Sequence, residues 1–318
     1  MGNSGIFAYI EYGKQSNFTT AVAVGGATRA YGLDQKVTSF SINENKIDLG
    51  DLNSPLIQKY AFGNFEGSLG VEWVLSNPWI FDSVLGNAAS TGAAGDFTHT
   101  YDDSKTVNAF TTELGFDAET TDRVIQIQRQ TTRLLTISAA MNETVKTRGD
   151  FQFGATPTTA GTTLDASITA EDVGSQFAYT MVYSTLENPS GTALAEVQSF
   201  ELTMNPNIRM IYEPNSENAV AAYKGRLDLS GRFVLSVKDN TWWNNIRARA
   251  EPTNNTIRLA FSNDLTLTNE KAILITLTGL GLGTLNIPID QYELVTEEIP
   301  FTARDIQVIA NNGTSLPP

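Results

Sequence analysis

Cysteine is absent from the 318-residue sequence, histidine occurs once, and charged residues make up only 18% of the chain. Without cysteine the protein forms no disulfide bonds and no thiolate metal site. A single histidine, His99, excludes a multi-histidine metal centre, and neither a His-Glu-x-x-His nor a Gly-x-Ser-x-Gly motif is present. His99 stands near Asp102 and Asp103 in the glycine-rich segment 86–105, which we interpret as a solvated loop. We therefore expect a protein with no catalytic residues, no metal and no cofactor.

Basic residues are also scarce, with 21 lysines and arginines against 35 aspartates and glutamates, and a net charge of −14. Sequence-independent binding to nucleic acid needs lysine and arginine to displace counterions, so this balance excludes a protein that holds DNA or RNA. Long apolar runs are missing as well, and residues 1–6 lack the basic and apolar stretches of a signal peptide. We expect a soluble protein with no membrane partner.

Most of the sequence alternates apolar and polar residues, which is typical of β-strands. In the first half the alternating segments are 7–12, 22–24, 37–42, 69–75, 110–116, 124–127 and 133–138. In the second half they are 177–183, 197–204, 227–237, 256–261, 273–278 and 291–296. The pattern predicts a mainly β protein.

One short helix is predicted in each half, at a cluster of aromatic residues. Asn77 can cap the first helix, with Pro78 at its first position and a stop near Gly86. The second helix begins near Asn240. We expect aromatic side chains of the helices and strands to lie in domain cores. These predicted core aromatics are Phe40, Trp73, Trp79, Phe200, Phe233 and Trp242.

The two halves repeat one another in the same order. Segment 37–42 (Val-Thr-Ser-Phe-Ser-Ile) returns as segment 197–202 (Val-Gln-Ser-Phe-Glu-Leu), and an asparagine-rich turn follows both. Three further blocks match at offsets of 162, 145 and 150 residues, namely 65–75 with 227–237, 114–116 with 259–261, and 145–151 with 295–301. Ordered matches over most of the chain indicate two tandem copies of one unit.

The duplication predicts two tandem β-sandwich or barrel domains, each with one short flanking α-helix. The first spans 1–153 and the second 175–310, with a linker at 154–174 that is rich in threonine, alanine and glycine, and a flexible tail at 311–318. The glycine run 279–283 has no following helix, so we interpret it as a tight turn or hairpin tip and not as a phosphate-binding loop.

The repeated block has a defined order: a Ser-Phe strand, an asparagine-rich turn, a Phe-Glu-Gly-Ser sequence, an alternating strand and an aromatic helix. The first copy occupies 39–43, 65–69 and 73–85, and the second 199–205, 228–231 and 233–246. This block resembles the tail tube proteins of long-tailed bacterial and archaeal viruses. The second copy departs from the first at Leu229, where the first has Gly67.

The resemblance implies a β-sandwich or barrel with a flanking helix and a structural role in a virion tail. In that family six single-domain subunits form a ring whose inner strands join into one barrel, and stacked rings form the tube through which the genome passes. A chain with two copies implies three chains per ring, with pseudo-six-fold symmetry. The implied partners are neighbouring copies, stacked rings, and the tail terminator, tape-measure and baseplate proteins. The implied place of synthesis is the host cytoplasm.

Acidic residues on or beside the repeated strands are our candidates for the lumen of such a tube. They are Glu66, Glu72, Glu201 and Asp228. Carboxylates repel phosphates, so an acidic lumen would conduct DNA without binding it specifically. The alternative for each residue is a position on the outer surface.

Two other functions remain open from the sequence. Tryptophans at the predicted helix starts and the Thr- and Asn-rich loops also fit a two-domain carbohydrate-binding or adhesion protein. A tail terminator or baseplate component would share the fold but close the tube instead of extending it.

Overall fold

The computed structural model describes residues 6–23, 29–50, 57–93, 96–117, 121–140, 143–161, 180–187, 193–194, 197–236, 256–262, 272–283 and 296–312. Within these residues the chain is mainly β, as the sequence predicts, and its strands pair antiparallel in several sheets. The predicted second helix near Asn240, Trp242 and the end of the tail from residue 313 lie outside the described residues.

The described elements alternate long strands with short hairpins. Those of the first half are β1 (Ile6–Lys14), β2 (Leu33–Asn43), β3 (Ile47–Gly50), β4 (Ile57–Ala61), β5 (Glu66–Val74), α1 (Ile80–Leu85), β6 (Gly86–Ala93), β7 (Asp96–Asp103), β8 (Phe110–Asp117), β9 (Arg123–Ala140), β10 (Lys146–Phe153) and β11 (Thr158–Gly161). Those of the second half are β12 (Thr180–Glu187), β13 (Ala193–Leu194), β14 (Val197–Asn205), β15 (Ile208–Ile211), β16 (Ala221–Lys224), β17 (Asp228–Ser236), β18 (Thr256–Ser262), β19 (Ala272–Thr278), β20 (Gly281–Leu282), β21 (Thr296–Ala303) and β22 (Asp305–Asn312).

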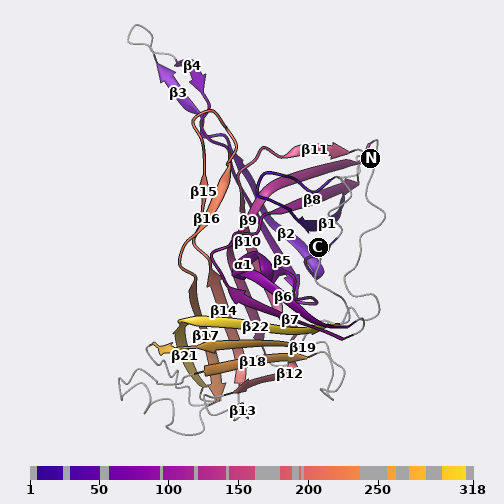
Figure 1. Ribbon diagram of the computed structural model, residues 1–318, viewed down its shortest axis with the longest axis vertical. Coiled ribbons are helices and arrows are strands. Elements are labelled where there is room, and N and C mark those ends of the chain that lie inside the picture. Colours follow the sequence, from indigo (N-terminus) through magenta and orange to yellow (C-terminus); the bar gives the residue numbers. More distant parts are fainter. Residues whose placement is uncertain are drawn as a thin grey trace.

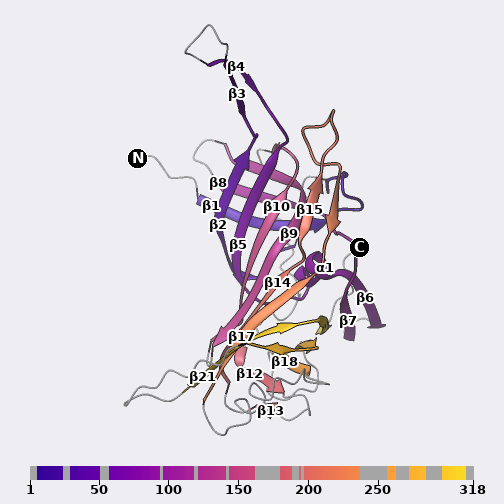
Figure 2. The same ribbon diagram turned by 90° about the vertical axis from the view of Figure 1, so that its left-hand side faces the viewer.

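One large sheet runs through both halves, in the order β2-β5-β10-β9-β14-β17-β21-β20 (Figure 2). The halves meet where β9 pairs with β14, and there Leu202 lies opposite Ile137 and Met204 opposite Leu135. The first four strands come from the first half and the last four from the second, and they correspond in order: β2 to β14, β5 to β17, β10 to β21 and β9 to β20. The sheet is therefore continuous across the boundary that the sequence predicts between two domains.

Strand β9 bends in its middle and pairs with different strands of the large sheet on the two sides of the bend. Its first part pairs with β8 and β11, and its second part pairs with β10 and β14. The bend lies at Arg129, whose φ of 55° is left-handed. The second half has the same bend between β19 and β20, at Gly279 with a φ of 66°. The glycine run 279–283 is thus a bend between two strands, and not the hairpin tip that we predicted, because β20 continues from it into the large sheet.

A second sheet has the order β13-β12-β18-β19-β22-β7-β6 and lies across the lower part of the molecule in Figure 1. Its last two strands come from the first half, which adds the hairpin β6–β7 to β22. The prediction of a solvated loop at 86–105 is therefore wrong, and His99 is buried beside the Trp79 ring at 5.0 Å. Glycine and alanine made the segment look irregular, although its threonine and aromatic residues alternate from Phe97 to Tyr101.

Buried apolar side chains of both halves form one contiguous core. At its centre in the first half, the ring of Tyr31 lies 4.5 Å from Tyr12 and 5.3 Å from both Trp73 and Phe151. Helix α1 is buried along its whole length and ends at Gly86, which has a φ of 83° and permits the left-handed stop that we predicted there. The helix begins two residues later than Pro78. In the described part of the chain, no helix has the length and apolarity needed to span a membrane.

Candidate assembly interface

Strand β2 forms one end of the large sheet, and its apolar side chains are exposed. Phe40 is 39% exposed and Ile42 is 49% exposed, although both lie on the core side of the sheet, opposite Leu69 and Gly67 of β5. The prediction that Phe40 is a core residue is therefore not met in the single chain, because β5 covers only one side of β2. Apolar side chains at an open sheet edge mark a surface that another strand can cover.

The corresponding strand of the second half, β14, is covered on both sides. Counted back from the turn residues Asn43 and Asn205, Phe40 corresponds to Leu202 and Ile42 to Met204, two residues beyond the match of 37–42 with 197–202 in the sequence. Strand pairing supports this register, since Phe40 lies opposite Leu69 and Leu202 lies opposite Gly231, which also differ by 162 residues. Leu202 and Met204 are fully buried, because β9 pairs with β14 on the side where β2 is open. Among the described strands, β14 has a neighbour on this side and β2 has none, so the difference in burial comes from the neighbour and not from the residue types.

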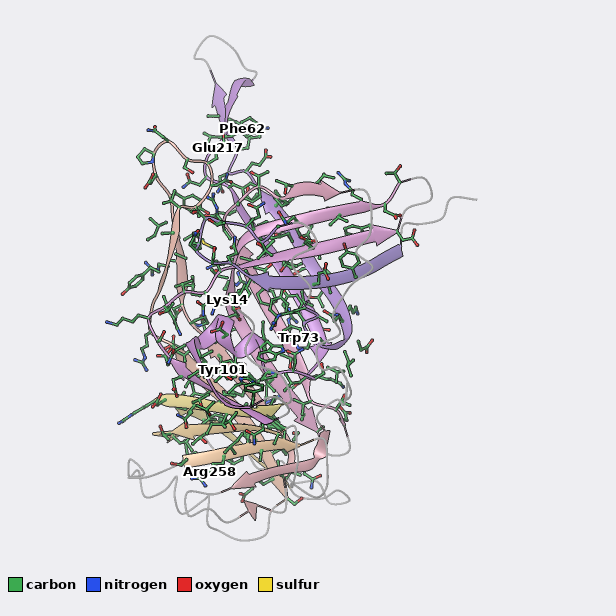
Figure 3. All side chains as sticks on the ribbon, turned by 45° about the vertical axis from the view of Figure 1, so that its right-hand side comes forward. Lys14, Phe62, Trp73, Tyr101, Glu217 and Arg258 are labelled. Carbon is green, nitrogen blue, oxygen red and sulfur yellow. The ribbon has the colours of Figure 1, made fainter. Side chains whose placement is uncertain are left out.

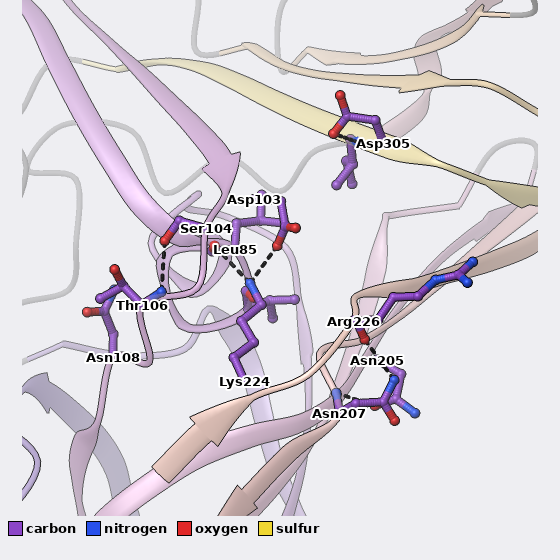
Figure 4. A network of polar contacts seen from close by, with 12 residues as sticks. Leu85, Asp103, Ser104, Thr106, Asn108, Asn205, Asn207, Lys224, Arg226 and Asp305 are labelled. Carbon is purple, nitrogen blue, oxygen red and sulfur yellow. Dashed lines mark hydrogen bonds and ion pairs between the residues drawn. The ribbon is translucent and has the colours of Figure 1, made fainter. Parts of the chain in front are cut away.

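The turns that follow β2 and β14 have the same geometry. Asn45 and Asn207 both have left-handed φ values, 45° and 50°. Each donates a hydrogen bond from its backbone N–H to a side-chain oxygen two residues earlier, that of Asn43 at 3.0 Å in the first half and that of Asn205 at 2.9 Å in the second. The side-chain amide of Asn45 then donates to the Asn64 carbonyl at 2.7 Å, 19 residues further along the chain. In the second half, the amide of Asn207 donates to the Arg226 carbonyl at 2.8 Å, also 19 residues further along (Figure 4). A hairpin follows each turn, β3–β4 in the first half and β15–β16 in the second.

The β15–β16 hairpin is anchored at its base by Lys224, whose side chain is buried (Figure 4). The ammonium donates to the carbonyls of Val84 and Leu85 at 2.7 and 2.9 Å, and to the carboxylate of Asp103 at 2.7 Å. Burial lowers the pKa of Lys224, while the Asp103 carboxylate opposes this shift. The ammonium thus binds carbonyls at the C-terminal end of α1, where a positive charge is favourable.

The tip of the same hairpin, residues 212–219, lies beside the base of β3–β4. The Tyr212 hydroxyl donates to the Phe65 carbonyl at 2.7 Å, and the Phe65 N–H donates to the Glu217 carbonyl at 2.8 Å. Burial, together with the charge of Glu66, raises the pKa of Tyr212 to about 12. Figure 3 labels Glu217 and Phe62, which both lie in the upper part of the molecule.

The β3–β4 hairpin projects beyond the body of the protein (Figure 1). Two large apolar side chains at its base are exposed, Phe62 at 60% and Ile47 at 54%. Counted from the turns at Asn45 and Asn207, Phe62 occupies the position that Lys224 occupies in the second half. The residue that anchors one hairpin therefore has an exposed aromatic counterpart in the other.

All four acidic lumen candidates lie on one face of the large sheet. Glu66 and Glu72 alternate on β5 and share a face with the β10 residue Arg148, which lies directly opposite Glu72. Ser138 of β9 is opposite Glu201, so the same face continues into the second half. Through β17 this face, which we call the polar face, includes Asp228.

Arginines accompany most of these carboxylates. Arg148 lies 3.7 Å from Glu72, Arg232 lies 3.3 Å from Glu201, and Arg226 lies 3.5 Å from Asp228. The Glu298 carboxylate contacts Arg232 as well, at 2.8 Å, and raises its pKa. Charged residues of the polar face include Lys36, Glu66, Glu72, Lys146, Arg148, Asp150, Glu201, Asp228, Arg232 and Glu298. The face is therefore paired in charge to a degree that the sequence did not predict.

The remaining predicted core aromatics are placed as follows. Trp73, Trp79, Phe200 and Phe233 are buried. Sequence reasoning missed the importance of Lys224 and Phe62, because neither belongs to a block that matches between the halves. The repeated asparagines Asn45 and Asn207 could have identified them. Each asparagine precedes a hairpin, and residues at equal distances from the two asparagines occupy equivalent positions at the hairpin bases.

A family model described as phage tail tube protein matches residues 12–303 of the chain. The match includes the large sheet of both halves and both hairpins. A comparison with curated proteins gives no match.

Proposed function

Because the chain belongs to the phage tail tube protein family, we propose that it is a structural subunit of a virion tail that assembles with its own copies into stacked rings. Its role is structural and not catalytic. The halves are tandem copies of one unit, three chains form each ring, and six similar units surround the axis. The same strand order in both halves and the same turn geometry at Asn45 and Asn207 support this arrangement.

The observation that carries the proposal is the difference between β2 and β14. Within one chain, the open side of β14 is covered by β9 of the preceding half. In a ring, β2 is covered in the same way by the last strands of the neighbouring chain, where β20 ends the sheet path of the described residues. Ile42 and Phe40 then become buried, and the exposed sheet edges disappear.

The polar face lines the lumen in this arrangement. The opposite face of the large sheet carries the apolar core, so the polar face is the one that remains in contact with water. Arginines in it are flanked by carboxylates, such as Arg232 between Glu201 and Glu298, which leaves few cations for DNA phosphates. DNA therefore moves through the tube without specific binding.

Electron microscopy of the purified chain tests the ring. We expect rings and tubes from the wild type, and monomers from Ile42→Asp, because a charge at the β2 edge blocks strand pairing. Ile211→Asp is the matched control, since Ile211 is similarly exposed at 45% but lies on β15. Ring formation by Ile42→Asp at the wild-type concentration, or monomers of the wild type under every condition, would contradict the proposal. Long tubes, as opposed to single rings, distinguish a tube subunit from a terminator or baseplate component.

A further inference from the structure

The two halves contain the same arginine–glycine pair, but with the residues exchanged between strands. In the first half Arg129 lies at the bend of β9, and Gly154 follows β10. In the second half the residues 150 positions later are Gly279 at the bend and Arg304 after β21. Arg304 packs directly over the glycine, since a Cβ added to Gly279 would lie 2.9 Å from the Arg304 Cβ. Each half thus has an arginine side chain at this bend. In the first half it belongs to the bent strand itself, and in the second half to the residue that follows the neighbouring strand β21.

In the first half this pair binds the tip of the β15–β16 hairpin. The Arg129 guanidinium donates to the Ala219 carbonyl, and the Ala219 N–H donates to the Gly154 carbonyl at 2.7 Å. A Cβ added to Gly154 would overlap with the Ala219 Cβ, so glycine allows the close approach. The arginine–glycine pair and Lys224 together hold the hairpin at its tip and at its base.

In the second half, neither of the two described hairpins β3–β4 and β15–β16 of the same chain docks at this bend. Arg304 is exposed, and the β15–β16 hairpin is already bound to the first half. The hairpin with the matching base turn is β3–β4, which projects from the body with Phe62 exposed. In the proposed ring, β2 of one chain pairs with the second half of the neighbouring chain. The β3–β4 hairpin follows β2 directly, so it lies beside the Gly279 bend of that neighbour.

We infer that the bend formed by Gly279 and Arg304 receives the β3–β4 hairpin of the neighbouring copy, with Phe62 as its anchor in place of Lys224. The inference rests on the proposed ring. Arg304 donates hydrogen bonds to the neighbour's hairpin, as Arg129 does to the Ala219 carbonyl within the chain. Phe62 is buried against the neighbour's second half.

The two joints of the ring therefore differ in chemistry. The joint within a chain uses an ammonium that needs the α1 carbonyls and Asp103 as acceptors. The interface between chains uses an aromatic side chain, which stabilises the interface only through burial of its apolar surface. Because Phe62 cannot donate to those acceptors, the β3–β4 hairpin is selective for a second half, and halves alternate around the ring.

The test compares Arg304→Ala and Phe62→Ala with two matched controls in the full-length chain. Arg258→Ala removes another exposed arginine, at the opposite end of the molecule from Phe62 (Figure 3). Ile47→Ala truncates the other exposed apolar residue at the hairpin base, whose counterpart Arg209 is exposed in the docked hairpin. Sedimentation velocity and electron microscopy measure the concentration at which half of the chains are in rings.

We expect each of Arg304→Ala and Phe62→Ala to raise that concentration by about tenfold or more, as loss of an interface hot spot does. The controls should assemble as the wild type does, and Phe62→Leu, which keeps an apolar anchor, should recover most of the loss. Thermal melting of each monomer confirms folding. Wild-type assembly by both Arg304→Ala and Phe62→Ala would overturn the inference and leave the proposed ring intact, whereas a wild type without rings would overturn both.

Discussion

Lys224 is a buried charge whose partners come from the other half of the chain. Its ammonium satisfies two carbonyls at the end of α1 and contacts Asp103. Lys224→Met keeps the length of the side chain but leaves those carbonyls without this donor. We expect the free energy of unfolding to fall by about 2 to 4 kcal/mol, measured by urea denaturation.

Lys146→Met is the control for this substitution. Lys146 contacts Glu143 at 2.9 Å on the surface, with both side chains more than half exposed, so its loss should change stability by no more than about 0.5 kcal/mol. Equal effects of the two substitutions would show that Lys224 is not an anchor.

Residue types alone predicted some of these details and not others. Gly86 was recognisable as the end of the helix, because the position after a helix often has a left-handed backbone conformation and glycine adopts it most easily. The position of Phe40 was not, because alternation shows which face of a strand is apolar and says nothing about whether a neighbour covers its edge. The bend at Arg129 was also missed, since arginine does not ordinarily mark a left-handed φ.

At the scale of elements, the position of the β15–β16 hairpin depends on the close contact of its residue Ala219 with Gly154. Gly154→Ala places a methyl group where the Ala219 Cβ lies, so the hairpin tip must move away. We expect a loss of about 1 to 3 kcal/mol and faster amide hydrogen exchange at residues 212–219. Gly281→Ala serves as the control, because its added Cβ would meet only the Thr302 hydroxyl, at 3.0 Å. Unchanged exchange in the tip of Gly154→Ala would contradict the role of this contact.

Elements formed by local patterns were the most predictable. Most described strands fall within or near the alternating segments, and α1 lies at the predicted aromatic cluster. The β6–β7 hairpin was mistaken for a loop because its stability depends on β22, about 200 residues away, and not on its own glycine-rich sequence. Pairing over such a distance leaves no local signal.

At the scale of the whole molecule, the sign of charge on the polar face should decide whether DNA adheres to the tube. We expect a variant with Lys at positions 66, 72, 201 and 228 to retain DNA, because it reverses four charges on one face and releases the arginines from their carboxylates. Co-sedimentation of tubes with DNA measures this, and retention should be lost at high salt.

The control for this variant reverses acidic charges elsewhere. Asp102→Lys and Asp122→Lys lie off the polar face and should leave DNA retention low. For equal net charge, this control is compared with the double variant Glu72→Lys and Glu201→Lys on the polar face. Equal retention by these two double variants would mean that net charge, and not the polar face, controls adhesion.

The continuity of the large sheet was the main feature of the molecule that the sequence did not predict. The repeated blocks indicated two units, but the pairing of β9 with β14 joins them into one surface. Matching sequences identify similar units. The relative placement of the units depends on which strand edges pair, and the edge strands of both halves have the same pattern of polar and apolar residues. Leu202 and Met204 are buried whereas Phe40 and Ile42 are exposed, and this difference distinguishes the covered edge from the open one.

The hairpin that the first half adds to β22 has a consequence for how a ring grows. Together with the β9–β14 pairing, it joins the halves at two places, so their mutual orientation is set when the chain folds. In the proposed ring, every second junction thus exists before any two molecules meet. A closed ring then requires three new junctions between molecules and not six, and the translational and rotational freedom lost on assembly is that of two bodies and not of five.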